Sequence, residues 1–281
     1  MEDRSSLEKQ TKVSGLSKAK PTILKIGGSV ITDKGEELKA RTNIIDRLAN
    51  EIQRANTNNL VIVHGGGSFG HPIAQRYAIK DGLKEESQKI HFCEAHHVMT
   101  VLNGLLMDAL VWHNVQAVSI TPSSVIMTKN GRIDFFEEAS LRKLLNMGFL
   151  PVMYGDAVLD IEIGFTILSG DQLVAALATR LNAERIIIGT DVDGLYSADP
   201  KVEKTASMLE NLTLEELTKL QSKFSKSTAV DVTGGMFGKI AELLPALEHG
   251  VPVTVLNATE PDRVYQALVG ERVKGTLIRK E

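Results

Sequence analysis

The sequence predicts an α/β fold in which helices cover both faces of one mostly parallel sheet. Short apolar runs alternate with amphipathic stretches along residues 21–281. The runs are apolar at consecutive positions, as in strands buried on both faces, and a helix between two strands favours a parallel pair. No proline-rich linker or internal repeat divides the chain, so any two lobes should share one continuous sheet.

Strands and helices are expected to alternate from residue 22 onwards. The expected strands are TILKIGG (22–28), LVIVHGGG (60–67), AVSIT (117–121), LPVMYGD (150–156), RIIIGTD (185–191) and VPVTVLN (251–257). Amphipathic helices are expected near 40–56, 86–113, 137–147, 171–182 and 235–249. Ser169 with Gln172, and Thr213 with Glu216, have the spacing of capping boxes at helix starts.

Composition excludes several classes of protein. The formal net charge of −3 indicates neither a nucleic-acid-binding nor a membrane-binding surface. No apolar stretch reaches the roughly 20 residues that a membrane span needs. The single cysteine, Cys93, excludes an intramolecular disulfide and fits the cytoplasm, which is reducing. Residues 1–20 are polar and are expected to form a disordered tail.

Four expected strands end in residues suited to binding anions. The turns are Gly27-Gly28-Ser29, Gly65-Gly66-Gly67-Ser68, Gly155-Asp156 and Gly189-Thr190-Asp191. In open α/β sheets, ligands bind at the carboxyl ends of the strands, where helix N-termini offer free N–H groups. Several such turns on one edge predict a long, polyanionic ligand.

The second turn also matches the dinucleotide-binding pattern GxGxxG at Gly65, Gly67 and Gly70. A dinucleotide-binding unit requires a helix, a second strand and then an acidic residue. Here His71-Pro72 follows the glycines, and the next stretch, YAIKDGLKEES, is typical of a polar loop. A dinucleotide-dependent oxidoreductase is therefore an alternative with little support.

Charged residues beside these turns point to phosphate. Lys25 lies inside an expected buried strand, where a lysine is costly unless an anion matches its charge. Lys34 follows in a turn, and Asp171 lies in the first turn of an expected helix, where a carboxylate is favoured. Lys239 is near a helix N-terminus that follows Gly235, a poor place for a lysine unless an anion binds there. Each residue alone also fits an ordinary surface position.

Taken together, KIGGS, HGGGSFGH, YGD, SGD, TDVDG and DVTGGM followed by Lys239 resemble the amino acid kinase superfamily over residues 21–281. The resemblance implies an αβα sandwich with an acceptor lobe at about 21–180 and an ATP lobe at about 181–281. It also implies a homodimer, and Mg²⁺ that arrives with ATP rather than at a protein metal site.

The resemblance further implies a role for each matched residue. The catalytic set is Lys25, Lys34, His71 and Asp171. ATP would contact Lys25, Gly27, Gly28, Ser29, Gly67, Thr190, Asp191, Gly235 and Lys239. The acceptor would contact Gly66, His71 and Gly155, with its tail against Phe92, Ala95 and Met99. The last three are also typical of an ordinary helix core.

The segment GGGSFGHP narrows the resemblance to the isopentenyl phosphate kinases, because relatives that phosphorylate carboxylates lack a histidine at this place. That likeness implies transfer of phosphate from ATP to isopentenyl phosphate, an isoprenoid monophosphate used for isoprenoid precursors. Fosfomycin kinases share the histidine and are the nearest alternative. A regulatory module that only binds nucleotide is a third, although Lys25, Lys34, Asp171 and Lys239 together argue against it.

Overall fold

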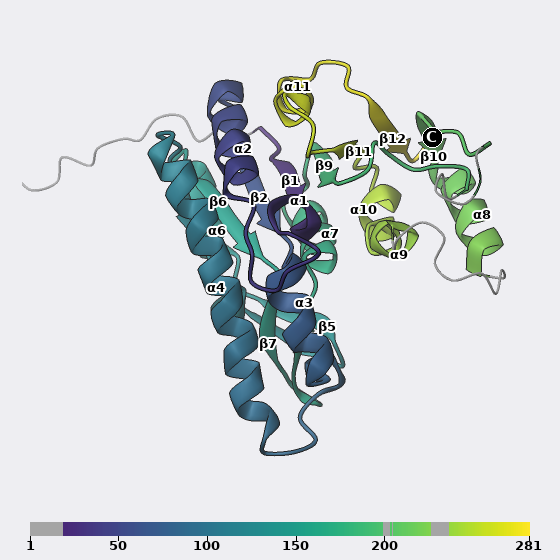
Figure 1. The fold of residues 1–281 in the computed structure, drawn as a ribbon. Coiled ribbons are helices and arrows are strands. Elements are labelled where there is room, and N and C mark those ends of the chain that lie inside the picture. Colours follow the sequence, from purple (N-terminus) through teal and green to yellow (C-terminus); the bar gives the residue numbers. More distant parts are fainter. Residues whose placement is uncertain (1–18, 199–202, 204, 226–235) are drawn as a thin grey trace, which may run out of the picture.

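The chain folds into three layers, with helices on both faces of a central sheet (Figure 1). This computed structural model describes residues 19–198, 203, 205–225 and 236–281. The expected disordered tail lies almost wholly outside the described residues. The predicted α/β sandwich is confirmed.

Within the described residues the central sheet has eight strands, in the order β10-β12-β11-β9-β1-β2-β6-β3. All six expected strands are present and run parallel to one another. They are β1 (Thr22–Ile26), β2 (Leu60–His64), β3 (Ala117–Ser119), β6 (Leu150–Tyr154), β9 (Arg185–Thr190) and β11 (Val253–Asn257). The remaining two are β12 (Gly275–Arg279), antiparallel to β11, and β10 (Asn211–Thr213) at the edge.

The pairing of β1 with β9 joins the two halves of the sheet. Strands from before residue 180 lie on one side of this pair, and strands from after it lie on the other. The two expected lobes therefore share one sheet. The assignment of one half to the acceptor and the other to ATP stays a prediction.

Alternate residues of the central strands face two separate hydrophobic cores. Ile23 and Val61 belong to one core, whereas their neighbours Leu24 and Ile62 belong to the other. The Leu24 side is covered by α1 (Gly28–Ile31), α2 (Thr42–Ala55), α3 (Gly67–Arg76), α4 (Gln88–Trp112) and α11 (Arg263–Val269). The Ile23 side is covered by α6 (Ala139–Asn146), α7 (Gly170–Arg180), α8 (Leu214–Ser225), α9 (Met236–Ala241) and α10 (Leu244–Glu248). None of the helices in the described part of the chain meets the length and apolarity required for a transmembrane span.

A second, four-stranded sheet was not expected from the sequence. Its order is β5-β4-β7-β8, with β4 (Ile126–Lys129), β5 (Arg132–Phe136), β7 (Asp156–Asp160) and β8 (Gly164–Leu168). Two short helical turns, α5 (Pro122–Val125) and η2 (Ile79–Asp81), lie nearby in the fold. Because β7 begins directly after the turn that ends β6, this sheet extends one wall of the pocket described below.

Helix α3 begins within the second glycine turn and contains both His71 and Pro72. A proline within a helix leaves the carbonyl four residues earlier without its usual donor. That carbonyl belongs to Ser68, and it accepts a hydrogen bond from Leu38 N instead (3.2 Å). The segment before α2 therefore compensates for the proline.

The expected helix starts at residues 170 and 214 are confirmed. Thr213 and Glu216 form a complete capping box, in which each side chain accepts from the other residue's N–H. Ser169 accepts from Gln172 N, but the Gln172 side chain binds backbone atoms of Gly131 and Ile133. The expected helix near 235–249 is divided into α9 and α10.

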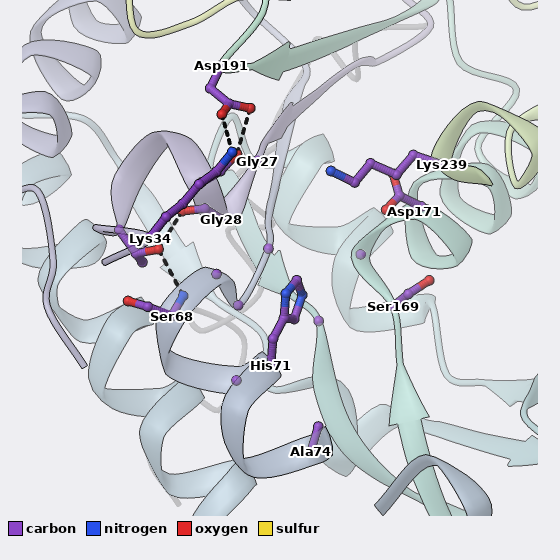
Figure 2. Close-up of a pocket in the computed structure, with 18 of the residues that line it drawn as sticks. Gly27, Gly28, Lys34, Ser68, His71, Ala74, Ser169, Asp171, Asp191 and Lys239 are labelled. Atoms are coloured by element: carbon purple, nitrogen blue, oxygen red, sulfur yellow. Dashed lines mark hydrogen bonds and ion pairs between the residues drawn. The ribbon is translucent and has the colours of Figure 1, made fainter. Parts of the chain in front are cut away.

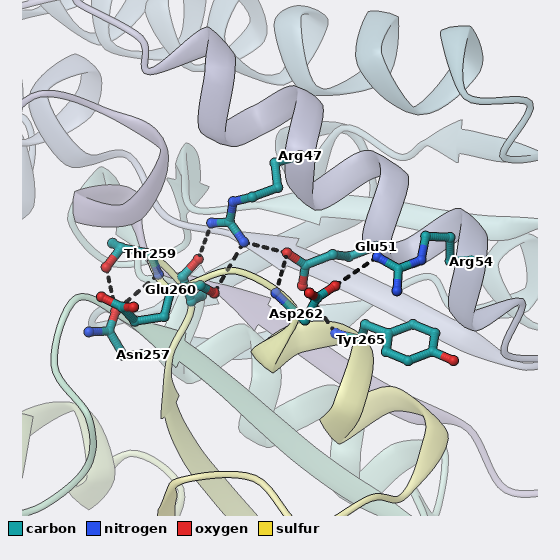
Figure 3. A network of polar contacts seen from close by, with 9 residues as sticks. Arg47, Glu51, Arg54, Asn257, Thr259, Glu260, Asp262 and Tyr265 are labelled. Carbon is teal, nitrogen blue, oxygen red and sulfur yellow. Dashed lines mark hydrogen bonds and ion pairs between the residues drawn. The ribbon is translucent and has the colours of Figure 1, made fainter.

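A buried ion pair joins α2 to the loop and helix that follow β11 (Figure 3). Glu51 is 1 % exposed, pairs with Arg47, and accepts hydrogen bonds from the backbone N–H groups of Asp262 and Tyr265. Arg47 also donates to the carbonyl of Ala258 (2.7 Å). These contacts tie the two halves of the chain together on the α2 side of the sheet.

Candidate active site

A pocket of about 1000 Å³ lies at the carboxyl edge of the parallel strands (Figure 2). Most of the residues expected at the site line it. These are Lys25, Gly27, Gly28, Ser29, Lys34, Gly66, Gly67, His71, Ala95, Met99, Gly155, Asp171, Asp191 and Lys239. The parallel direction of β1, β2, β6 and β9 brings their terminal turns to one edge, as the sequence indicated.

The first two glycine turns pack backbone against backbone. A Cβ on Gly28 would overlap the backbone nitrogen of Gly67, and one on Gly65 would come within 2.8 Å of Gly28 N. Gly67 also has φ +49°, a left-handed conformation that favours glycine. Thr32 bridges the two turns, because its hydroxyl donates to Gly28 O (2.8 Å) and accepts from Ser68 N (3.0 Å). These glycines are therefore required by contact between the turns.

The turns differ in the N–H groups that they offer to a ligand. Gly28 and Ser29 lie in the first turn of α1 and Gly67 begins α3, where backbone N–H groups lack helical acceptors. By contrast, Gly27 N donates to Gly189 O (2.8 Å) and Gly155 N donates to His64 O (3.0 Å). The expectation that Gly155 offers its N–H to a phosphate does not agree with this geometry.

Lys25 places an ammonium group in the floor of the pocket. The residue is 4 % exposed, and its amine forms an ion pair with Asp171 in the first turn of α7. Burial lowers the pKa of Lys25, the charge and hydrogen bond of Asp171 act in the opposite direction, and nearby Lys239 lowers it further. The lysine predicted to need an anion therefore has a carboxylate partner within the protein.

Lys34 is held by a different carboxylate. Its amine pairs with Asp191 (2.5 Å), which also accepts from Ser29 Oγ (3.0 Å; Figure 2). Burial raises the pKa of Asp191, but the hydrogen bonds from Lys34 and Ser29 outweigh that effect and lower it overall. Among the residues that the structure describes, Asp171 pairs with Lys25 and Asp191 pairs with Lys34.

His71 and Lys239 point toward the same space at the centre of the pocket (Figure 2). The His71 ring is open to the pocket yet surrounded by protein atoms, and this desolvation lowers its pKa. The positive charges of Lys239 and Lys25 lower the pKa further, while Asp171 raises it. These surroundings favour the neutral form of His71, whereas an anion bound between these groups would favour its protonated form.

Of the residues that the structure describes, five carboxylates line the pocket, and each has a basic partner. Besides the two pairs above, the partners are Lys39 for Glu36, Arg76 for Glu37 and His96 for Asp156. Among the residues that the structure describes, no carboxylate lies within 4 Å of the Lys239 amine. Within the described part of the pocket, Lys239 is therefore available to an anionic ligand.

Two expected site residues, Phe92 and Thr190, are not among the residues that line the pocket. Phe92 lies one helical turn before Ala95 and stacks on Phe165 of β8, with ring centroids 5.0 Å apart. Thr190 is buried at the end of β9, where its hydroxyl donates to Asp191 (3.3 Å). Gly235 lies outside the described residues.

A comparison with known families identifies the chain. The model of the amino acid kinase family matches residues 20–257, which is most of the sequence. The chain belongs to the amino acid kinase family.

Within this family the chain is similar to proteins named isopentenyl phosphate kinase. The protein of Methanothermobacter thermautotrophicus is 42 % identical over 91 % of this chain and 98 % of its own length. The protein of Methanocaldococcus jannaschii is 35 % identical, with coverages of 92 % and 98 %. An X-ray structure of isopentenyl phosphate kinase superposes with a TM-score of 0.80 at 39 % identity, covering 92 % of this chain and 99 % of that one.

One part of this amino acid kinase pocket was missed by the sequence analysis. Asp156 lines the pocket and pairs with His96 on α4. The sequence indicated only that Asp156 follows Gly155 at the end of a strand. The helical spacing of α4 indicated that Ala95 and Met99 share a face, but gave no signal for His96. That contact depends on how α4 packs on β7, which no local pattern encodes.

The contact between the glycine turns yields a prediction. Replacing Gly28 with alanine should lower the melting temperature and abolish most kinase activity, because the new Cβ overlaps Gly67 N. Gly104→Ala is the control, since a Cβ there meets no atom within 4 Å and alanine favours the helix. Thermal unfolding and a coupled ADP-release assay measure both effects. Wild-type stability and activity in Gly28→Ala would contradict the interpretation.

Proposed function

We propose that the chain is a cytoplasmic enzyme that phosphorylates isopentenyl phosphate with ATP, giving isopentenyl diphosphate and ADP. The observation that supports this most is the placement of His71 beside the glycine turns, facing Lys239 in a pocket that also contains Lys25. The relatives named isopentenyl phosphate kinase match nearly the whole chain. The product would supply isoprenoid synthesis.

The reaction would place two phosphate groups between the glycine turns. In our assignment, the acceptor phosphate binds His71 and the N–H group at Gly66. The ATP phosphates bind Lys25, Lys239, the N–H group at Gly67 and the N–H groups of the first turn. Asp191 is proposed to border the rest of the nucleotide, and Gly235 is proposed to close over the ATP phosphates together with Lys239. Lys34 reaches the phosphates when it leaves its exposed pair with Asp191.

The residues of the pocket suffice for this chemistry. An oxygen of the acceptor phosphate forms a bond to the γ-phosphorus, and the bond from that phosphorus to the bridging oxygen of ADP breaks. A phosphate oxygen is already a nucleophile at neutral pH, so a strong general base is unnecessary. Catalysis then consists of aligning two polyanions and neutralising their charge, which lysines and backbone N–H groups accomplish.

We propose that Mg²⁺ enters with ATP. No group of three or more His, Cys, Asp or Glu side chains that could hold a metal ion occurs within the described residues. Asp171 and Asp191 face the pocket, but each is already paired with a lysine. Such a site fits an ion bound chiefly by phosphate oxygens and water.

His71 distinguishes this proposal from its alternatives. Replacing His71 with alanine should reduce turnover of isopentenyl phosphate by at least about 100-fold, within the range for a group that stabilises transferred charge. ATP binding should change little, because Lys25 and Lys239 remain. His97→Ala is the matched control, since His97 is an exposed histidine on α4 outside the pocket lining.

The same ADP-release assay should be run with isopentenyl phosphate, fosfomycin and glutamate side by side. Preferred turnover of fosfomycin would favour the fosfomycin kinase alternative. ATP binding without turnover of any acceptor would favour a regulatory module. Undiminished turnover by His71→Ala would remove this residue from the mechanism.

The tail of the acceptor is proposed to lie between α3, α4 and β7. Small residues form this wall, namely Ala74, Ala95 and Ala157. Because Ala95 leaves space, tails longer than isopentenyl, such as geranyl, should be accepted. Ala95→Phe should then lower the turnover of geranyl phosphate relative to isopentenyl phosphate, as competition between the two substrates would measure. An unchanged or increased ratio would contradict the assignment.

We further propose that the chain forms a homodimer through the outer face of α4. Four large apolar residues on this helix are exposed, with Ile90 at 60 %, Val101 at 43 %, Val111 at 60 % and Trp112 at 81 %. Burial of such side chains between two copies would be favourable. Sedimentation equilibrium should give twice the chain's mass of 30.6 kDa. The mass of a single chain would contradict the proposal.

A further inference from the structure

His96 and Asp156 form a polar contact behind the pocket wall. His96 Nδ1 lies 2.9 and 3.2 Å from the two carboxylate oxygens of Asp156. The same carboxylate accepts from Ser123 N (3.3 Å) and Ala157 N (2.8 Å). The contact therefore connects α4, α5 and the junction between β6 and β7.

Both partners adjoin residues that line the pocket. Asp156 itself lines it and follows Gly155, while His96 follows Ala95 on α4. One turn further along α4, the Met99 sulfur lies where Cβ atoms on Gly66 and Gly70 would meet it, at 3.0 and 2.9 Å. Helix α4 thus packs beneath the glycine turn that leads to His71, and the contact with Asp156 fixes α4 on the other side.

Asp156 differs from the other carboxylates of the pocket. Its side chain is fully buried, whereas its partner His96 is one-third exposed and carries no permanent charge. Burial raises the pKa of Asp156 overall, and the hydrogen bond from His96 acts in the opposite direction. Without His96, the carboxylate would lose its basic partner, which is costly, and its ionised form would repel a nearby phosphate.

We propose that His96 is a positioning residue for the acceptor phosphate, which holds the buried Asp156 carboxylate away from the phosphate and offsets its charge. This inference rests on the proposed phosphorylation of isopentenyl phosphate. In this role His96 affects the binding of the acceptor and does not contact ATP.

The test compares His96→Leu, Asp156→Asn and the double variant by steady-state kinetics with both substrates. His96→Leu should raise KM for isopentenyl phosphate about tenfold, which corresponds to about 1.4 kcal/mol. Its kcat and its KM for ATP should change less than about twofold, since the ATP residues are untouched. Adding Asp156→Asn should bring the KM for isopentenyl phosphate most of the way back to the wild-type value, because the unpaired charge is removed. His97→Leu, on the same helix, should behave as wild type.

The results separate a charge effect from a structural one. An unchanged KM in His96→Leu, or a double variant as impaired as His96→Leu, would overturn the positioning role. If thermal unfolding shows that His96→Leu is not folded, His96→Gln is measured instead, alone and combined with Asp156→Asn. His96→Gln should then raise KM by a smaller factor, and Asp156→Asn should reverse that rise. Absence of isopentenyl phosphate turnover in the wild-type enzyme would instead refute the proposed function, and the positioning role with it.

Discussion

The site depends on the contact between the two glycine turns that follow β1 and β2. Their backbones approach so closely that Gly28 cannot bear a Cβ without overlapping Gly67. This approach brings the start of α1 and the start of α3 together, so the free N–H groups of both helices face one space. The glycines therefore have two functions, since they permit the contact and leave the backbone accessible to phosphate.

Around that contact, charge is nearly balanced within the protein. Lys25 is buried with Asp171, and Lys34 is paired with Asp191, so neither lysine depends on a ligand for stability. These pairs can hold the two ammonium groups in place before substrates arrive. Lys239 has no carboxylate partner among the described residues, and His71 faces it across the pocket. The excess positive charge thus lies where two phosphates would meet.

Much of this arrangement could be predicted from the sequence, because it follows from strand order and glycine position. Consecutive apolar residues identified β1, β2 and β9, and their shared direction placed Lys25, Gly28 and Asp191 at one edge. The pairing of Asp156 with His96 could not be predicted, because it joins residues 60 positions apart through helix packing. Phe92 was expected in the pocket but does not line it, for a related reason. Helical spacing shows which residues of α4 share a face, but not how far along the helix the pocket extends. The hydrogen bond from Gly155 N to His64 O could not be predicted either, because it depends on how β6 lies against β2.

Pro72 has a consequence for the segment that contains Lys34. Because proline has no N–H, the carbonyl of Ser68 can accept a hydrogen bond from the backbone N–H of Leu38, which follows Lys34 in the chain. Any other residue at position 72 would bring a second donor to the same oxygen and compete with Leu38. A residue usually regarded as a helix breaker therefore anchors a neighbouring loop. The segment that carries Lys34 and the helix that carries His71 are joined in part by this hydrogen bond, so a movement of one would be felt by the other.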